Sequence, residues 1–501
     1  MLRVLLALVL ALPLVAQKKE LTLDAIYHPE QKVALGGAIQ SKFEWIDDNT
    51  FLWPRKDDAG KFADWTVYDA TTGKTRTLAL DDEDAIFNAT YTAAIISDDD
   101  ELTLVSLAGG KSKSLTSRAG LEEEPTFSPD SKKVAFLRDN DLYVVDLDGN
   151  ETRLTKNGSA TLLNGKLDYV YQEEIYGRGI WKGFWWSPDS SRIAFLQLDE
   201  SKVPEHTIVD HIPTHVGVNT FRYPKAGDPN PIVKLFVVPA TGGEPKEIDN
   251  TRYADVQPLI VNVTWNGNAV VYQVQNREQT WLDLVTASAA TGESRVLIHE
   301  TTKAWVDSLA NPIWRPDGSF LWQSERDGYR HVYHYKADGT LIRQITKGEW
   351  EARDVHGADA QFVYFSGTER SVIGQDIYRI RFDGTGLKRL SDRDGTHNAT
   401  FNPSMSRYID KWSDVNTPDQ IRLHKNDGTM QRVVDENRSA LYAQYDMPEV
   451  QFLQVKTRDG FVMEAEMIRP TNFDPSKKYP VYQHVYGGPH APQVRNVWGI
   501  P

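Results

Sequence analysis

One pattern recurs along most of the chain: a strand-like run, a tight turn and a second strand-like run rich in Thr and basic residues. The clearest copy reads F-S-P-D-S-K-K-V-A-F-L and then D-L-Y-V-V-D-L-D-G-N-E-T-R-L-T. Its Asp-Gly turn supplies the positive φ angles that a tight hairpin needs. The alternation at residues 143–147 gives the strand one apolar face. Eight copies occupy residues 64–78, 102–115, 127–155, 235–248, 282–297, 331–346, 376–390 and 420–434.

The spacing of these copies predicts the architecture. Repeats of roughly 40–50 residues with several strands each are typical of β-propeller blades. Blades cannot bury their faces alone, so neighbouring copies must stack. We therefore predict an all-β protein with an eight-bladed β-propeller over residues 41–440. An unclosed β-solenoid and a pair of β-sandwiches are the alternatives.

One interval is too long for a single blade. Between Gly149 and Gly242 the chain carries an insertion at about residues 156–232. Within it, residues 167–186 read L-D-Y-V-Y-Q-E-E-I-Y-G-R-G-I-W-K-G-F-W-W, which places Glu173 and Glu174 side by side among aromatic residues. An insertion in a regular array usually emerges on one face and often carries the binding function.

The two adjacent carboxylates predict a site for a cation. Residues 169–176 look helical, and Gly177 and Gly179 are expected to end the helix. Neighbouring carboxylates repel, so Glu173 and Glu174 are suited to a cation held between them, such as the free amino terminus of a peptide. The alternative is that both acids are solvated surface residues, which is common for adjacent acids on a helix.

Composition excludes several classes of function. The formal net charge of -14 argues against a nucleic-acid partner, and the absence of cysteine excludes disulfides and a cysteine nucleophile. His206, His211 and His215 lie close in sequence, but Pro213 disfavours a helix that would present two of them on one face. We therefore predict no metal site and no cofactor.

The first residues predict an exported protein. Arg3 precedes an apolar run from Val4 to Ala16, and polar residues follow. Residues 1–16 therefore read as a signal peptide, followed by an N-terminal segment at 17–40, and we expect a secreted or periplasmic protein. The alternative is an uncleaved anchor, but a spanning helix needs roughly 20 apolar residues. No later stretch predicts a stable membrane span.

The chain changes character after the repeats. Val450–Val455 and Phe461–Ile468 alternate like a hairpin around Arg458-Asp459-Gly460, and Tyr479–Tyr486 is predicted to be a strand that leads to a Gly-Gly-Pro turn. Residues 445–501 look like the first strands of an α/β-hydrolase domain. That fold carries its nucleophile in Gly-x-Ser-x-Gly, and this motif does not occur in the sequence.

Several blocks resemble the dipeptidyl peptidase IV family of serine peptidases. They are D-Y-V-Y-Q-E-E-I-Y, the following F-W-W-S-P-D-S-S-R-I-A-F-L-Q-L-D-E-S-K-V-P, R-Y-P-K-A-G-D-P-N-P, S-E-R-D-G-Y-R-H-V-Y and K-K-Y-P-V-Y-Q-H-V-Y-G-G-P-H. The resemblance implies that Glu173 and Glu174 hold the substrate's amino terminus. It also implies that the Tyr486 hydroxyl stabilises the oxyanion, and that the family's Ser, Asp and His would follow Pro501. We therefore expect a truncated member that is inactive alone.

The resemblance also sets expectations about substrate and partners. It implies peptides with a free N-terminus, cleaved after the second residue with a preference for Pro or Ala at that position, and it leaves a homodimer of the full-length form open. The family's arginine for the substrate carbonyl has no match at residues 89–94, and Arg178 and Arg326 are the candidates instead. Alternatives are a tripeptidyl or other peptidase of the prolyl oligopeptidase clan, and a non-catalytic propeller that binds peptides or proteins.

Overall fold

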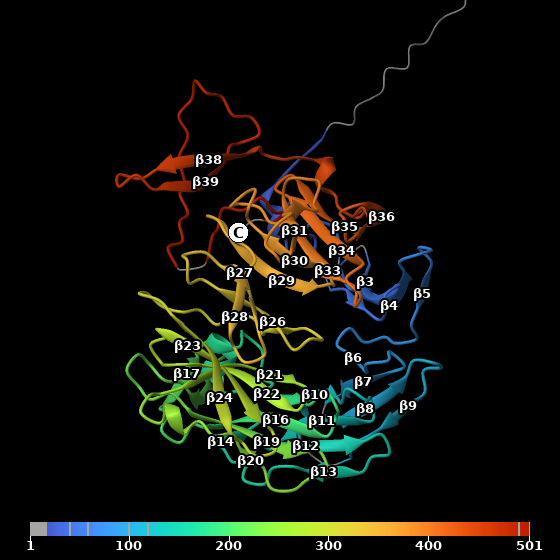
Figure 1. Ribbon diagram of the computed structural model, residues 1–501. Coiled ribbons are helices and arrows are strands. Elements are labelled where there is room, and N and C mark those ends of the chain that lie inside the picture. Colours follow the sequence, from blue (N-terminus) through green and yellow to red (C-terminus); the bar gives the residue numbers. More distant parts are fainter. Residues whose placement is uncertain are drawn as a thin grey trace, which may run out of the picture.

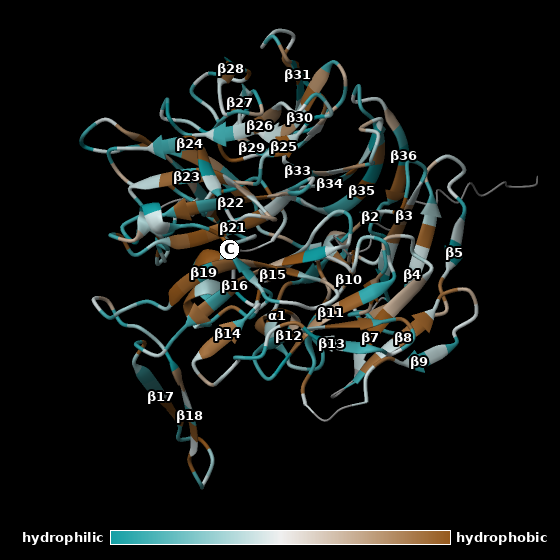
Figure 2. Ribbon diagram, turned by 60° about the horizontal axis from the view of Figure 1, so that its bottom comes forward, coloured by the Kyte–Doolittle hydropathy of each residue, from teal (hydrophilic) through white to brown (hydrophobic). Residues whose placement is uncertain are grey.

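The computed structural model describes residues 18–39, 42–57, 60–98, 101–117, 120–488 and 491–499, so the predicted signal peptide at 1–16 lies outside the described residues. Within these ranges, eight antiparallel sheets follow one another along the chain and form a ring (Figure 2). Seven of the sheets have four strands and one has five. The predicted eight-bladed β-propeller is therefore confirmed.

Each blade is built from one continuous stretch of chain. The strands of the first four blades are β2 (Glu44–Trp45), β3 (Thr50–Lys56), β4 (Phe62–Asp69) and β5 (Thr75–Thr77); β6 (Ile86–Phe87), β7 (Ala93–Asp98), β8 (Glu101–Ser106) and β9 (Ser112–Ser114); β10 (Glu123–Phe127), β11 (Lys133–Arg138), β12 (Asp141–Asp146) and β13 (Glu151–Arg153); and β14 (Leu162–Asn164), β15 (Phe184–Trp186), β16 (Arg192–Asp199), β19 (Ile232–Pro239) and β20 (Lys246–Glu247).

The later blades repeat this plan, and a short 3₁₀ turn at Thr251–Tyr253 leads into them. Their strands are β21 (Leu259–Asn266), β22 (Ala269–Gln275), β23 (Trp281–Ser288) and β24 (Ser294–Thr301); β25 (Ile313–Trp314), β26 (Phe320–Ser324), β27 (His331–Tyr335) and β28 (Leu341–Gln344); β29 (Ala352–Ala358), β30 (Phe362–Gly367), β31 (Asp376–Arg381) and β32 (Lys388–Arg389); and β33 (Thr396–Phe401), β34 (Arg407–Asp414), β35 (Thr417–Lys425) and β36 (Met430–Asp435).

The predicted hairpins form the outer two strands of the blades. In the third blade, Tyr143 and Val145 of β12 are buried and pair with Arg153 and Glu151 of the outermost strand, β13. Some hairpin turns need glycine for two reasons: the backbone has a positive φ angle, and the neighbouring blade leaves no room for a side chain. Gly339 has a φ of +89°, and a Cβ there would lie 2.1 Å from the carbonyl oxygen of Leu297 in the neighbouring blade.

Apolar clusters join each blade to the next. Between the first and last blades, Phe51 and Tyr68 pack in one cluster with Ile409 and Leu423. The Trp45 indole N–H also donates to the Thr400 carbonyl oxygen at 2.9 Å. No strand is exchanged between these two sheets in the part of the chain that the structure describes. Side-chain packing and hydrogen bonds between loops therefore close the ring.

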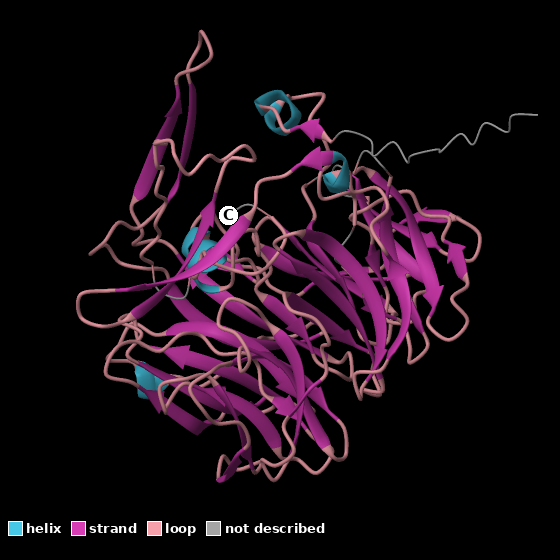
Figure 3. Ribbon diagram, turned by 90° about the horizontal axis from the view of Figure 1, so that it is seen from above, coloured by secondary structure: helices cyan, strands magenta, loops and turns pink. Residues whose placement is uncertain are grey.

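The fourth blade carries two additions. Its first strand is split into β14 and β15, which both pair with β16, and residues 165–183 leave the sheet between them. A second excursion after β16 forms an arm of two strands, β17 (Glu205–Asp210) and β18 (Gly217–Arg222), which projects away from the ring (Figures 2 and 3).

The segments before and after the ring meet. β1 (Lys19–Glu20) pairs in parallel with β37 (Tyr445–Asp446), which follows a 3₁₀ turn at Tyr442–Gln444. The short helix α1 (Leu23–Tyr27) follows β1. None of the helices in the described ranges is long and apolar enough to cross a membrane.

Beyond the ring, the predicted hairpin is confirmed and the predicted strand is wrong. β38 (Val450–Lys456) and β39 (Val462–Ile468) pair in antiparallel fashion and lie above the blades in Figure 1. Tyr479–Tyr486 is not a strand. A strand needs a neighbour for its backbone hydrogen bonds, and no described segment pairs with these residues. Val481 and Tyr482 are about nine-tenths exposed there.

Candidate functional site

Residues 165–183 form a loop whose ends are pinned together. The Leu167 N–H donates to the Trp181 carbonyl oxygen at 2.8 Å, and the Gly183 N–H donates to that of Gly165 at 2.8 Å. Lys166 and Lys182 form a backbone bridge between these contacts. A loop with close ends, packed by its own side chains, can hold a functional group in a fixed position.

The loop contains the helical turn predicted at residues 169–176. At Tyr171–Ile175 it is wound as a π-helix, in which the Tyr176 N–H donates to the Tyr171 carbonyl oxygen at 2.8 Å. Gly177 and Gly179 have φ values of +116° and +87° and end the turn, as predicted. Single π-turns occur frequently at functional sites.

One side of the turn is anchored in the core. Tyr171 is fully buried in the cluster that joins the fourth and fifth blades, and its hydroxyl accepts the Ile260 N–H at 3.4 Å. Tyr176 lies 6.0 Å from Trp185, measured between ring centroids. These aromatic residues fix the position of the turn and leave its other side open.

Two buried acids lie at the base of the turn. The Asp168 carboxylate accepts the Tyr171 N–H at 2.9 Å, which is the role of an N-cap residue. Burial raises the pKa of Asp168 to about 6. Burial, and then the charge of Asp168, raise the pKa of Glu200 to about 7. Neither residue was predicted from the sequence, although an Asp directly before a helix is a recognisable cap signal.

The predicted acidic pair lies on the open side. The Glu173 side chain is 14% exposed, and Glu174 is an exposed residue. Arg178 donates from Nε to Oε1 and Oε2 of Glu173, at 2.8 and 3.0 Å. The pKa of Arg178 is raised by this hydrogen bond and by attraction to Glu173 and Glu174. The loop itself therefore supplies a cation beside the two carboxylates.

The other candidate residues lie elsewhere. Arg326 forms an ion pair with Glu300, and its guanidinium lies 4.6 Å from the centroid of the Tyr333 ring, so it belongs to the sixth blade. Tyr486 is 60% exposed in the segment that is not a strand. Among the described residues, no hydrogen bond or ring contact joins Tyr486 to Glu173 or Glu174.

The three histidines do not come together as ligands. His206 lies 5.8 Å from Tyr223 between ring centroids, and His211 and His215 are exposed at the tip of the arm. In the part of the chain that the structure describes, no group of three or more His, Cys, Asp or Glu side chains could hold a metal ion.

An aromatic cluster connects the root of the arm to the acidic turn. The Tyr169 ring lies 5.3 Å from Phe221 and 5.1 Å from Tyr223, between centroids. This contact was not predicted from the sequence. The available signal was that two aromatic residues, Phe221 and Tyr223, stand close together near the end of the excursion after β16.

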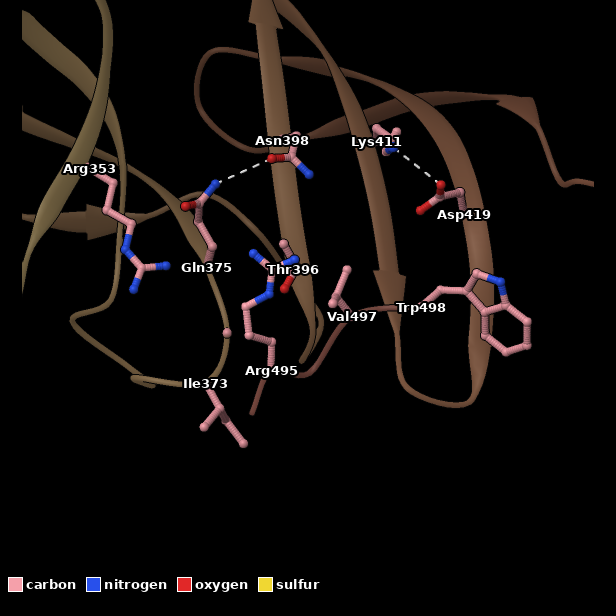
Figure 4. A pocket seen from close by; sticks show the side chains of 11 residues that line it. Arg353, Ile373, Gln375, Thr396, Asn398, Lys411, Asp419, Arg495, Val497 and Trp498 are labelled. Atoms are coloured by element: carbon pink, nitrogen blue, oxygen red, sulfur yellow. Dashed lines mark hydrogen bonds and ion pairs between the residues drawn. The ribbon is translucent and has the colours of Figure 1, made fainter. Parts of the chain in front are cut away.

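A polar cavity of about 320 Å³ lies between the seventh and eighth blades. Figure 4 shows side chains from both blades and from residues 495–498 around it. The Asn496 N–H donates to the Ile373 carbonyl oxygen at 2.6 Å, and Lys411 pairs with Asp419 at 3.2 Å. None of the residues predicted for the site lines this cavity.

The fold and the site together define a class: an eight-bladed propeller whose fourth blade presents an inserted acidic turn. Residues 63–419 match the family described as the dipeptidyl peptidase IV (DPP IV) N-terminal region, and the chain belongs to this family.

Named relatives agree with this assignment. Dipeptidyl peptidase 4 of Trichophyton equinum is 29% identical over 402 residues, which are 76% of this chain and 52% of the relative. A probable dipeptidyl-aminopeptidase B of Emericella nidulans is 31% identical over 406 residues, covering 74% and 44%. The chain thus spans about half the length of the curated relatives it matches.

Solved structures share the fold. The crystal structure of Porphyromonas gingivalis dipeptidyl peptidase 4 matches with a TM-score of 0.84 and 25% identity over 96% of this chain and 71% of the other. A putative dipeptidyl aminopeptidase IV from Bacteroides ovatus matches with a TM-score of 0.77 and 24% identity, with the same coverage of both chains.

Proposed function

We propose that this chain is the substrate-binding part of a serine-type dipeptidyl peptidase, which releases dipeptides from the free N-termini of peptides. The observation that carries the proposal is the acidic pair, Glu173 and Glu174, on a pinned turn in the fourth blade. Membership of the DPP IV N-terminal family supports it. The preference for Pro or Ala at the second position is part of the proposal.

The chemistry of the pair suits an amino terminus. An α-amino group has an ordinary pKa of about 8 and is therefore mainly protonated at neutral pH. It offers three N–H donors, and two carboxylates offer acceptors on two sides. Because the turn is anchored by Tyr171 and by its pinned ends, it would hold the first residue at a constant distance from the reacting bond.

The chemical step is assigned to the rest of such an enzyme. The β38–β39 hairpin and residues 479–486 would begin its α/β-hydrolase domain, and the Tyr486 hydroxyl would donate to the oxyanion. Gly-x-Ser-x-Gly does not occur in the sequence, so we assign no nucleophile to this chain and expect no hydrolysis from it alone. The same observation favours a peptide-binding propeller as the second candidate.

The proposal extends to export and assembly. Residues 1–16 would act as a secretory leader, so that the protein is secreted or periplasmic. A homodimer of the full-length form is a prediction that light scattering can check.

Peptide binding tests the central claim. We expect the full chain to bind the tripeptide Ala-Pro-Ala and not its N-acetyl form, because acetylation removes the positive charge. The double substitution Glu173→Gln with Glu174→Gln should weaken binding about tenfold or more, since hydrogen bonds to charged groups contribute about 1.5–3 kcal/mol each. Isothermal titration calorimetry at low ionic strength measures both effects.

The control is Glu436→Gln, which removes an exposed, ion-paired glutamate far from the turn and should leave affinity unchanged. Equal binding of free and acetylated peptide by the unaltered chain would contradict the proposed function. Unchanged affinity in the double variant would contradict the role of the acidic pair.

A further inference from the structure

Arg178 already occupies the position that a ligand cation would take. Its guanidinium Nε donates to both carboxylate oxygens of Glu173, at 2.8 and 3.0 Å. The Glu173 side chain is 14% exposed, whereas that of Arg178 is 83% exposed. Among the described residues, no hydrogen bond reaches the Glu174 carboxylate. The loop therefore supplies one internal cation to two carboxylates and leaves one carboxylate free.

The backbone places Arg178, independently of the ion pair. Arg178 stands between Gly177 and Gly179, both with positive φ angles. The Gly179 N–H donates at 2.8 Å to the side-chain oxygen of Gln172, which is buried. The turn would thus keep its shape without the guanidinium. The arginine head group, which stays in water, can leave Glu173 at little cost, because exposed ion pairs are weak.

The charges then determine what the turn can bind. Glu173 and Glu174 carry two negative charges and Arg178 one positive charge, so the three groups together hold one net negative charge. A peptide ammonium brings one positive charge and must share or displace Arg178 to reach Glu173. The first available acceptor is Glu174.

We infer that Arg178 is an internal counterion that competes with the amino terminus of the peptide for Glu173 and so lowers the affinity of the site. The inference rests on the proposed function, because it presupposes that the acidic pair binds an ammonium group. It makes Arg178 a residue that sets affinity without being required for binding.

Substitution of Arg178 tests the competition. Arg178→Met removes the charge and keeps much of the side-chain length, and it should tighten binding of Ala-Pro-Ala about two- to fivefold, the range expected for an exposed ion pair. Arg178→Lys keeps the charge without the bidentate geometry and should lie between Arg178→Met and the unaltered chain. The gain should shrink in about 0.5 M salt, which screens exposed charges.

The matched control is Arg438→Met, which removes a similarly exposed arginine from its pair with Glu436 and should leave affinity unchanged. Circular dichroism and thermal unfolding establish that each variant is folded. Unchanged or weaker binding by folded Arg178→Met, with the unaltered chain still preferring the free over the acetylated peptide, overturns the counterion role alone. No preference in the unaltered chain overturns the proposed function and the counterion role together.

Discussion

Asp168, a single buried acid at the acidic turn, makes the stability of the fold depend on pH. Its carboxylate caps the turn, and burial raises its pKa from 3.8 to about 6. The folded state therefore holds this proton more tightly than the unfolded state does. Between about pH 4 and pH 6 the folded chain binds more protons, so the free energy of unfolding falls as pH rises through this window. The full loss is on the order of 3 kcal/mol.

Asp168→Asn should remove this pH dependence. The Asn side-chain oxygen can still accept the Tyr171 N–H, but the buried charge is gone. We expect the variant to have a higher thermal midpoint than the unaltered chain at about pH 8 and a similar one at about pH 4, below the window in which the stability is lost, measured by differential scanning fluorimetry.

Asp189→Asn is the control of opposite sign. Hydrogen bonds from Ser187 and Ser191 lower the pKa of Asp189 to about 2, so ionisation of this residue favours the fold and its removal should not stabilise the protein. An equal rise in the midpoint of Asp168→Asn at both pH values would show that the pKa shift is not the cause.

At the scale of single residues, the sequence shows which chemical groups the site has more readily than it shows which of them are in contact. The adjacency of Glu173 and Glu174 and the glycines that end the turn could be read directly. The pairing of Arg178 with Glu173 could not, because a spacing of five residues is not a contact spacing in a regular α-helix and the π-turn was not predicted. The binding role of the acidic pair and the oxyanion role of Tyr486 stay predictions.

At the scale of elements, turn chemistry was the most informative signal. The eight predicted hairpins coincide with the third and fourth strands of the described blades, because Asp-Gly and similar turns fix the register. Innermost strands such as β2, β6 and β25 have only two residues each and show no alternation. Tyr479–Tyr486 alternates like a strand. A strand forms only where a neighbouring segment accepts and donates its backbone hydrogen bonds, and the alternation of these residues does not show whether such a neighbour is present.

Within the propeller, at residues 44–435, the β17–β18 arm should be the first part to be cut by a protease. It is a sheet of two strands with which no third described strand pairs, and such hairpins are marginally stable. Residues 211–216 at its tip are all exposed. We expect limited digestion with proteinase K, followed by mass spectrometry, to find the first cuts there while circular dichroism of the ring is unchanged. First cuts inside a four-stranded blade would contradict this view.

At the scale of the whole molecule, the contact between the first and last blades should carry much of the stability of the ring. Leu423 is fully buried in the cluster that joins them. Leu423→Ala should lower the free energy of unfolding by about 2–5 kcal/mol. It should also speed hydrogen exchange in both terminal blades, at residues 44–77 and 396–435, as measured by mass spectrometry.

Leu284→Ala is the matched comparison, because Leu284 is equally buried between the fifth and sixth blades, which the chain connects directly. Its effect on hydrogen exchange should stay near those two blades. Leu453→Ala, at a position 40% exposed in β38, should have little effect on either measurement. Equal exchange in the terminal blades of the two buried variants would show that ring closure has no special role.

The closure of the ring also has a consequence for synthesis on the ribosome. Trp45 of the first blade bonds to Thr400 of the last, 355 residues later in the chain. At about 5–20 residues per second, that partner emerges roughly 20–70 seconds afterwards. Until then the last blade cannot cover Phe51 and Tyr68. The nascent chain is therefore most prone to aggregate before its final repeat has been synthesised.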